Sequence, residues 1–161
     1  MITSRNTSVN SAKLPKLYTS KAARSIYEGK RVIDLGCGKF DNAKAFAESL
    51  GCKVGMYDPW NRPAEENAAA LSASYDVAVI SNVLNVIQKP EDRRDLLQLA
   101  SSKAPVILVT VYEGDQTGKG RITKADCWQE NRRTESYVEE IAKYLPEYRV
   151  TRKGNLIVGR R

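Results

Sequence analysis

The sequence contains no histidine and only three cysteines among its 161 residues. Histidine is the commonest general base and the commonest metal ligand, so its absence excludes a serine-hydrolase triad and a histidine-built metal centre. The thiols of Cys37, Cys52 and Cys127 are too few and too scattered for a disulfide framework or a zinc site. We therefore expect no metal site and read these cysteines as packing residues in a reducing compartment.

Long hydrophobic runs are also missing. The longest apolar run covers residues 105–111, far short of the ~18 residues that a membrane span needs. The polar segment 1–16 has no apolar region typical of a secretory signal. We expect a cytoplasmic protein without membrane contact, made of a flexible basic arm (1–16) and one domain (17–161).

The net charge of +7 is unevenly distributed along the chain. Residues 1–31 carry +6, residues 32–117 carry −4, and residues 118–161 carry +5. A basic head and tail can contact an anionic partner such as nucleic acid, or can be solvated ends that aid solubility. The composition leaves both interpretations open.

Short β-branched segments alternate with amphipathic segments along the chain. We expect strands over residues 31–35, 52–57, 75–81 and 105–112, helices over 19–27, 41–50, 61–73, from 90 onward and over 136–144, and a final hairpin over 148–158. This order predicts an α/β fold with a Rossmann-like, doubly wound and mostly parallel sheet of about six strands, ending in an antiparallel hairpin. Its ligand should lie at the carboxyl ends of the strands. The polar stretch 113–133 carries no expected element.

The segment Val32-Ile-Asp-Leu-Gly-Cys-Gly38 carries the most chemical information. Its two glycines let the backbone turn tightly after a strand and approach a ligand closely. A dinucleotide fingerprint would have a third glycine at position 41, where this chain has Asp41, which with Asn42 can cap the helix that follows. A carboxylate there disfavours a pyrophosphate and, with Asp34, favours a cationic ligand such as S-adenosylmethionine (SAM). A nicotinamide oxidoreductase is the weaker alternative.

Two further polar residues follow the next two expected strands. Asp58 lies 22 residues after Gly36, where a carboxylate can accept hydrogen bonds from both ribose hydroxyls of an adenosine. Its alternative role is that of a turn residue before Pro59. Asn82 would present an amide near the cofactor, or would cap a turn or helix.

These segments resemble the successive motifs of class I SAM-dependent methyltransferases, through Ile33-Asp-Leu-Gly-Cys-Gly38, Asp58 and residues 76–84. More narrowly, Tyr57-Asp-Pro-Trp-Asn-Arg-Pro63 and Asn82-Val-Leu-Asn-Val-Ile87 are similar to methyltransferases associated with DNA phosphorothioation. The similarity covers about residues 18–145.

The resemblance implies SAM as cofactor and assigns roles to several positions. Asp34, Gly36 and Gly38 would bind its methionine part, Asp58 its ribose, and residues Asn82 to Leu84 would lie near the transferred methyl group. Only about twenty residues separate Asp58 from the next expected strand, so the third strand usual in this fold is expected to be missing. Tyr57, Trp60 and Pro63 would then form walls of the adenine pocket.

The acceptor side is less defined. Candidate substrate residues are Asn85, Tyr112, Trp128 and Gln129. The 113–133 stretch contains Trp128, Gln129, Arg121 and Lys124, which can together stack on a nucleic acid base and neutralise a phosphate. Alternatively, the stretch can be a disordered basic loop. No catalytic residue is assigned, because methyl transfer from a sulfonium needs mainly in-line positioning and a dry site.

We therefore expect a SAM-dependent methyltransferase with an unidentified acceptor, for which nucleic acid is one candidate. The alternative is a non-catalytic module on a reduced methyltransferase fold, which binds SAM or a partner subunit.

Overall fold

The computed structural model describes residues 3–4 and 12–161, and its main feature is a six-stranded sheet in the order β2-β1-β3-β4-β8-β7. The strands are β1 (Arg31–Leu35), β2 (Lys53–Tyr57), β3 (Val77–Ser81), β4 (Val106–Thr110), β7 (Arg149–Lys153) and β8 (Leu156–Arg160). The first four run parallel, whereas β8 pairs antiparallel with both β4 and β7. The predicted Rossmann-like sheet with a C-terminal hairpin is confirmed.

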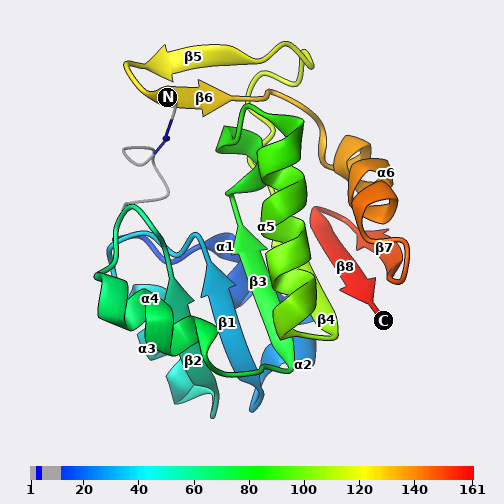
Figure 1. Ribbon diagram of the computed structural model, residues 1–161. Helices are drawn as coiled ribbons and strands as arrows, with labels where there is room; N and C mark the ends of the chain where they lie inside the picture. The colour runs from blue at the N-terminus through cyan, green and yellow to red at the C-terminus, as the bar shows by residue number, and fades with distance from the viewer. Residues whose placement is uncertain (1–2, 5–11) are drawn as a thin grey trace.

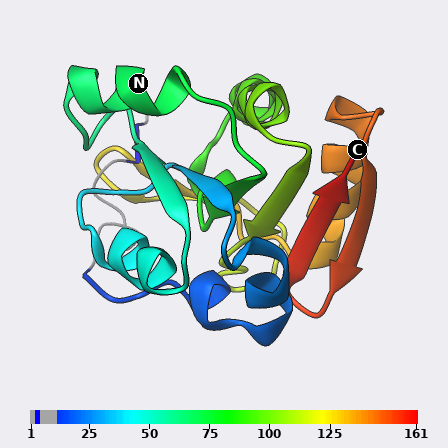
Figure 2. The same cartoon turned by 90° about the horizontal axis from the view of Figure 1, so that it is seen from below.

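Helices cover both faces of the sheet (Figure 2). They are α1 (Lys16–Thr19), α2 (Lys21–Tyr27), α3 (Asn42–Ser49), α4 (Ala64–Leu71), α5 (Pro90–Lys103) and α6 (Thr134–Tyr144). Two hydrophobic clusters result: α1, α2 and α3 pack on one face, and α4, α5 and α6 pack on the other. All five residues of β3 are buried, because a central parallel strand is covered on both sides.

The start of α3 differs from the expected capping. Asp41 occupies the N-cap position, but its side chain makes no capping hydrogen bond. Its Oδ1 instead accepts from Nη1 of Arg62 at 2.6 Å. The guanidinium of Arg62 thus takes the place of the backbone N–H of the first helical turn, which a capping side chain would accept from.

The stretch 113–133 is not an unstructured loop. It contains β5 (Arg121–Lys124) and β6 (Cys127–Gln129), which form a separate two-stranded unit, called the hairpin below. The hairpin lies beyond the carboxyl ends of β1 and β3 (Figure 1). All four β5 side chains are exposed, so the segment lacks the alternation by which strands are recognised.

The expected gap in the sheet is present. Residues 58–76 are all described and contain α4 but no strand, so β2 forms one edge of the sheet. A 3₁₀ turn, η2 (Leu84–Val86), follows β3. Of the helices that the structure describes, none combines the length and apolar character of a membrane span. Most of the predicted arm lies outside the described residues, apart from residues 3–4 and 12–16.

Candidate cofactor and acceptor site

A cavity of about 300 Å³, called the cofactor cavity below, opens at the carboxyl ends of β1, β2 and β3. Its lining comes from the end of β1 (Gly36), the end of β2 (Tyr57, Asp58, Pro59, Trp60, Asn61), the turn after β3 (Val83, Val86, Ile87), α5 (Asp95, Leu96, Leu99) and the chain start (Thr3, Ser4). Most of these side chains are apolar or aromatic. Such a cavity with a few polar groups suits a small organic ligand.

The glycine loop, residues 36–41, forms one wall beside the cavity. Gly36 and Gly38 have φ angles of +80° and +74°, a region that other residues adopt only with strain. A Cβ on Gly36 would lie 2.6 Å from Cγ2 of Val83. Glycine at position 36 is thus required both by the turn and by the close approach of Val83.

Asp58 joins the end of β2 to the glycine loop. Its Oδ2 accepts from the backbone N–H of Gly38 at 2.9 Å and from Nδ2 of Asn61 at 3.2 Å. Its Oδ1 accepts from the backbone N–H groups of Trp60 and Asn61, at 2.9 and 3.1 Å. The carboxylate therefore acts as the turn residue of its alternative interpretation while also lining the cavity.

Arg62 holds the other side of the glycine loop. Its guanidinium donates to the carbonyl oxygens of Gly38 and Phe40, at 2.8 and 2.7 Å, and its side chain is 7% exposed. It also forms ion pairs with Asp41 and Glu66. The glycine loop is thus fixed by the carboxylate of Asp58 and the guanidinium of Arg62, which both lie in the segment after β2.

Asp34 ends up buried beneath the glycine loop. The hydroxyl of Tyr18 donates to its Oδ2 at 2.5 Å. Burial raises the pKa of Asp34 to about 6, the Tyr18 hydrogen bond and the Arg62 charge lower it, and the Asp58 charge raises it. Removal from water outweighs the favourable contacts.

The two buried carboxylates of this region, Asp34 and Asp58, accept hydrogen bonds but form no ion pair within the described part of the chain. Among the described residues, neither Asp34 nor Asp58 has a lysine or arginine nitrogen within 4.0 Å. Their hydrogen-bond donors are a hydroxyl, backbone N–H groups and an amide, all of them neutral. This arrangement fits a ligand that brings its own positive charge, and the apolar cavity fits an attached adenosine.

The predicted cofactor residues fall into three groups. Gly36, Tyr57, Asp58 and Trp60 line the cavity. Gly38 and Asp34 contact the residues that shape it, through Asp58 and Tyr18. Asn82 has a φ of +57° and donates its backbone N–H to Thr110, while Leu84 lies in the core with no exposed surface.

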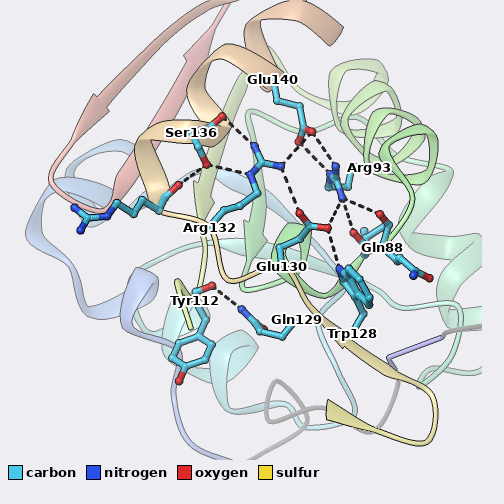
Figure 3. A network of polar contacts seen from close by, with 11 residues as sticks. Gln88, Arg93, Tyr112, Trp128, Gln129, Glu130, Arg132, Ser136 and Glu140 are labelled. Atoms are coloured by element: carbon cyan, nitrogen blue, oxygen red, sulfur yellow. Dashed lines mark hydrogen bonds and ion pairs between the residues drawn. The ribbon is translucent and has the colours of Figure 1, made fainter. Parts of the chain in front are cut away.

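The predicted acceptor residues form a chain of amide contacts. Nδ2 of Asn85 donates to Oε1 of Gln129 at 3.2 Å, and Nε2 of Gln129 donates to the carbonyl of Tyr112 at 3.0 Å. Nε1 of Trp128 donates to Glu130 at 2.9 Å. Asn85 and Gln129 are buried, whereas the side chain of Tyr112 points to solvent (Figure 3).

A buried charge cluster of Arg93, Glu130, Arg132 and Glu140 supports the base of the hairpin (Figure 3). Arg93, on α5, pairs with Glu130 at 3.2 Å and with Glu140 of α6 at 3.0 Å. Its Nη1 also donates to the carbonyl of Ile87, at 2.7 Å. The cluster ties α5, α6, the hairpin and the turn after β3 together.

Ser4 fastens the hairpin to the cofactor cavity. Its Oγ donates to the carbonyl of Val86 at 2.7 Å and accepts from the backbone N–H of Trp128 at 3.1 Å. Its backbone N–H donates to the carbonyl of Asp126 at 2.7 Å. Ser4 and Thr3 therefore lie between the hairpin and the turn after β3, on the lining of the cavity.

Sequence reasoning missed several of these residues. Leu96 and Leu99 are three residues apart on α5, so the sequence indicates that they share one helix face. It does not indicate that this face lines the cavity. Arg62 was quoted only within a family-like segment, and its contacts with the glycine loop depend on folding. Ser4 sits in a polar segment without any pattern.

Comparisons with known proteins agree with this geometry. The family model described as a methyltransferase domain matches residues 10–148. No sequence among the curated proteins matches at a significant level.

Solved structures share the fold at low identity. The magnesium protoporphyrin IX methyltransferase of Synechocystis PCC 6803 with bound SAM has a TM-score of 0.57 at 15% identity, over 91% of this chain and 76% of that one. A SAM-dependent methyltransferase from Mesorhizobium loti has a TM-score of 0.57 at 12% identity, over 90% and 100%. The glycopeptide N-methyltransferase MtfA, complexed with S-adenosylhomocysteine, has a TM-score of 0.56 at 13% identity, over 88% and 86%. Since the family model spans most of the chain, the protein belongs to the methyltransferase domain family and is a SAM-dependent methyltransferase.

Proposed function

We propose that the cofactor cavity holds the adenosine of SAM and that the glycine loop, above Asp34, holds its methionine part. Gly36, Tyr57, Asp58 and Trp60 would contact the adenosine. Bound SAM supplies an electrophilic methyl group on a sulfonium. The observation that carries this assignment is the largely apolar cavity at the strand ends, lined by the carboxylate of Asp58, whose hydrogen-bond donors are all neutral.

The residues of this chain then bind, orient and exclude water. Asp58 and Arg62 hold the glycine loop in one conformation through hydrogen bonds to Gly38. Thr3 and Ser4 cover the cavity on the side of the hairpin. Positioning in a dry site is the main requirement of methyl transfer, so no general base is assigned.

The acceptor in this proposal is nucleic-acid-related. Support comes from the basic residues of the 113–133 stretch and from the resemblance of residues 57–63 and 82–87 to methyltransferases associated with DNA phosphorothioation. The free thiols of Cys37 and Cys52 support a cytoplasmic location. A partner subunit would be a further component of the acceptor site.

Calorimetric titration with S-adenosylhomocysteine tests the cofactor assignment. We expect binding in the micromolar range, about −8 kcal/mol, and loss of detectable binding in Asp58→Ala. Asp76→Ala is the matched control, because Asp76 also accepts a backbone N–H but lies at the start of β3, away from the cavity. Asp58→Asn keeps the side-chain shape and shows whether the loss reflects folding. Absence of heat from folded wild-type protein at millimolar ligand overturns the proposal.

One observation favours the non-catalytic alternative. Each oxygen of Asp58 already accepts two hydrogen bonds, so a ribose contact requires one of them to be exchanged. Incubation with methyl-labelled SAM and cellular nucleic acid, protein and small-molecule fractions separates the two functions. Transfer of label to any fraction eliminates the alternative, whereas cofactor binding without transfer to any fraction supports it.

A further inference from the structure

The hairpin region carries both buried and exposed charges. Of its acidic side chains, Glu113 accepts the backbone N–H of Thr134 and Glu130 pairs with Arg93, whereas Asp115 is exposed and accepts from the hydroxyl of Thr117. Lys119, Arg121 and Lys124 are instead exposed, and no carboxylate of the described chain lies within 4.0 Å of them. The hairpin therefore presents three exposed cations that form no ion pair within the described part of the chain.

Exposed apolar side chains accompany these cations. Ile122, on β5, is 58% exposed, and Tyr112 is 61% exposed. Tyr112 is held beside the hairpin because its carbonyl accepts from Gln129 of β6. Positive charge interleaved with exposed planar or apolar groups is the pattern by which proteins bind single-stranded nucleic acid, since the phosphates meet cations and unpaired bases stack.

The hairpin is also a fixed platform rather than a loose loop. The charge cluster fastens its base to α5 and α6 (Figure 3), and Ser4 fastens β6 to the turn after β3. That turn lines the cofactor cavity through Val86. A nucleic acid strand bound along β5 would thus be held at a fixed position relative to the cavity (Figure 1).

We propose that the hairpin binds the backbone of single-stranded nucleic acid through Lys119, Arg121 and Lys124, with a base stacked on Tyr112 beside the hairpin. This inference rests on the proposed function for its catalytic meaning, because it names the acceptor class of the same site. The exposed aromatic side chain favours unpaired bases over an acidic protein, which offers charge without stacking faces.

Fluorescence anisotropy of labelled oligothymidylate at about 0.1 M salt tests the proposal with two triple variants. The first replaces Lys119, Arg121 and Lys124 by alanine. The second, its control, replaces Lys21, Lys30 and Lys53, which are exposed residues outside the hairpin, with the same change in net charge. We expect the first variant to bind at least tenfold more weakly and to reduce the slope of log affinity against log salt by about 2, and the control to stay within about twofold of wild type.

Tyr112→Ala and Tyr112→Phe separate stacking from charge. We expect alanine to weaken oligothymidylate binding at least fivefold with an unchanged salt slope, and phenylalanine to bind as wild type does. Equal weakening by both triple variants would reduce the effect to net charge and overturn the proposal. Displacement of the oligonucleotide by polyglutamate as readily as by unlabelled oligothymidylate would overturn it in favour of an acidic protein.

Titration with S-adenosylhomocysteine keeps this inference apart from the proposed function. The hairpin variant should retain cofactor binding, because none of its three residues lines the cavity. Loss of oligonucleotide binding with cofactor binding intact supports the inference. If the wild-type protein binds the oligonucleotide through the hairpin but does not bind the cofactor, the inference about the hairpin stands and the cofactor assignment is refuted.

Discussion

The cofactor cavity and the base of the hairpin both bury carboxylates, but they satisfy them in opposite ways. Beside the cavity, Asp34 and Asp58 accept hydrogen bonds from neutral donors. Beneath the hairpin, Glu130 and Glu140 pair with the guanidinium groups of Arg93 and Arg132. Neutral donors satisfy the oxygens and leave the negative charge, whereas guanidinium groups cancel it.

This difference gives the two regions different tasks. Buried carboxylates without an ion pair can attract a cationic ligand, and the energetic cost of burying one is visible in the raised pKa of Asp34. The charge cluster beneath the hairpin stabilises the fold, and because its charges cancel it contributes little to the electrostatic field at the surface. The exposed cations of the hairpin therefore determine which ligands this face attracts. Four substitutions, taken in order of expected effect, probe this contrast.

The largest effect is expected from Arg93→Ala. The substitution removes the cation between Glu130 and Glu140, whose side chains are 13% and 14% exposed, so it should lower the free energy of unfolding by about 3–5 kcal/mol. Urea unfolding measures this loss. Arg94→Ala, at an exposed ion pair on the same helix, is the control and should cost less than about 1 kcal/mol. If Arg93→Ala and Arg94→Ala lowered the free energy of unfolding equally, the charge cluster would not stabilise the fold.

Gly36→Ala should have the next largest effect, about 2–4 kcal/mol, because it adds backbone strain and a contact with Val83. Gly118→Ala is the matched control, since Gly118 has a φ of +75° but open space around it. The difference between the two measures the steric part alone. Val83→Ala combined with Gly36→Ala should recover part of the loss, and no recovery would refute the steric explanation.

The pH dependence of Asp34 should be smaller, about 2 kcal/mol. Its pKa is raised from 3.8 to about 6 by burial, so the folded protein binds this proton more tightly than the unfolded chain does. Stability therefore falls as pH rises from about 4 to 6 and stays lower above that range. Asp34→Asn should remove this decline, as urea midpoints at about pH 4 and pH 7.5 would show. A parallel pH profile in the variant would contradict the assignment.

Ser4→Ala should have the smallest effect on stability, about 1 kcal/mol, because it deletes two side-chain hydrogen bonds, to Val86 and from Trp128. Its clearer readout is local: hydrogen exchange at the Trp128 amide should accelerate, and S-adenosylhomocysteine should dissociate faster. Ser72→Ala, which removes a local hydrogen bond to Ala69, should change neither. Unchanged exchange at Trp128 would mean that Ser4 does not fasten the hairpin.

The main sheet was predictable because its signals are local. Strands such as β3 and β4 are nearly continuous apolar runs, which is the pattern typical of parallel strands that are buried on both faces. The two glycines and Asp58 were readable for the same reason: each lies directly after a strand, and parallel strands bring their carboxyl ends together.

The remaining features depend on contacts between distant segments. Arg93 and Glu140 are 47 residues apart, and no spacing rule joins them. Asp41 was expected to cap a helix, but Arg62, 21 residues away, offers a stronger charged donor. The hairpin escaped prediction because β5 buries none of its side chains. Side chains that exchange local partners for distant ones are the ones that sequence patterns miss.

The contacts of Ser4 have a consequence for biosynthesis. Its hydroxyl bonds to residues 82 and 124 positions further along the chain. A ribosome releases the chain from its amino end, so Ser4 must wait for most of the polypeptide before its partners exist. The cofactor cavity is consequently among the last features to be completed, and a nascent chain stalled before Trp128 would carry an open, unfinished pocket.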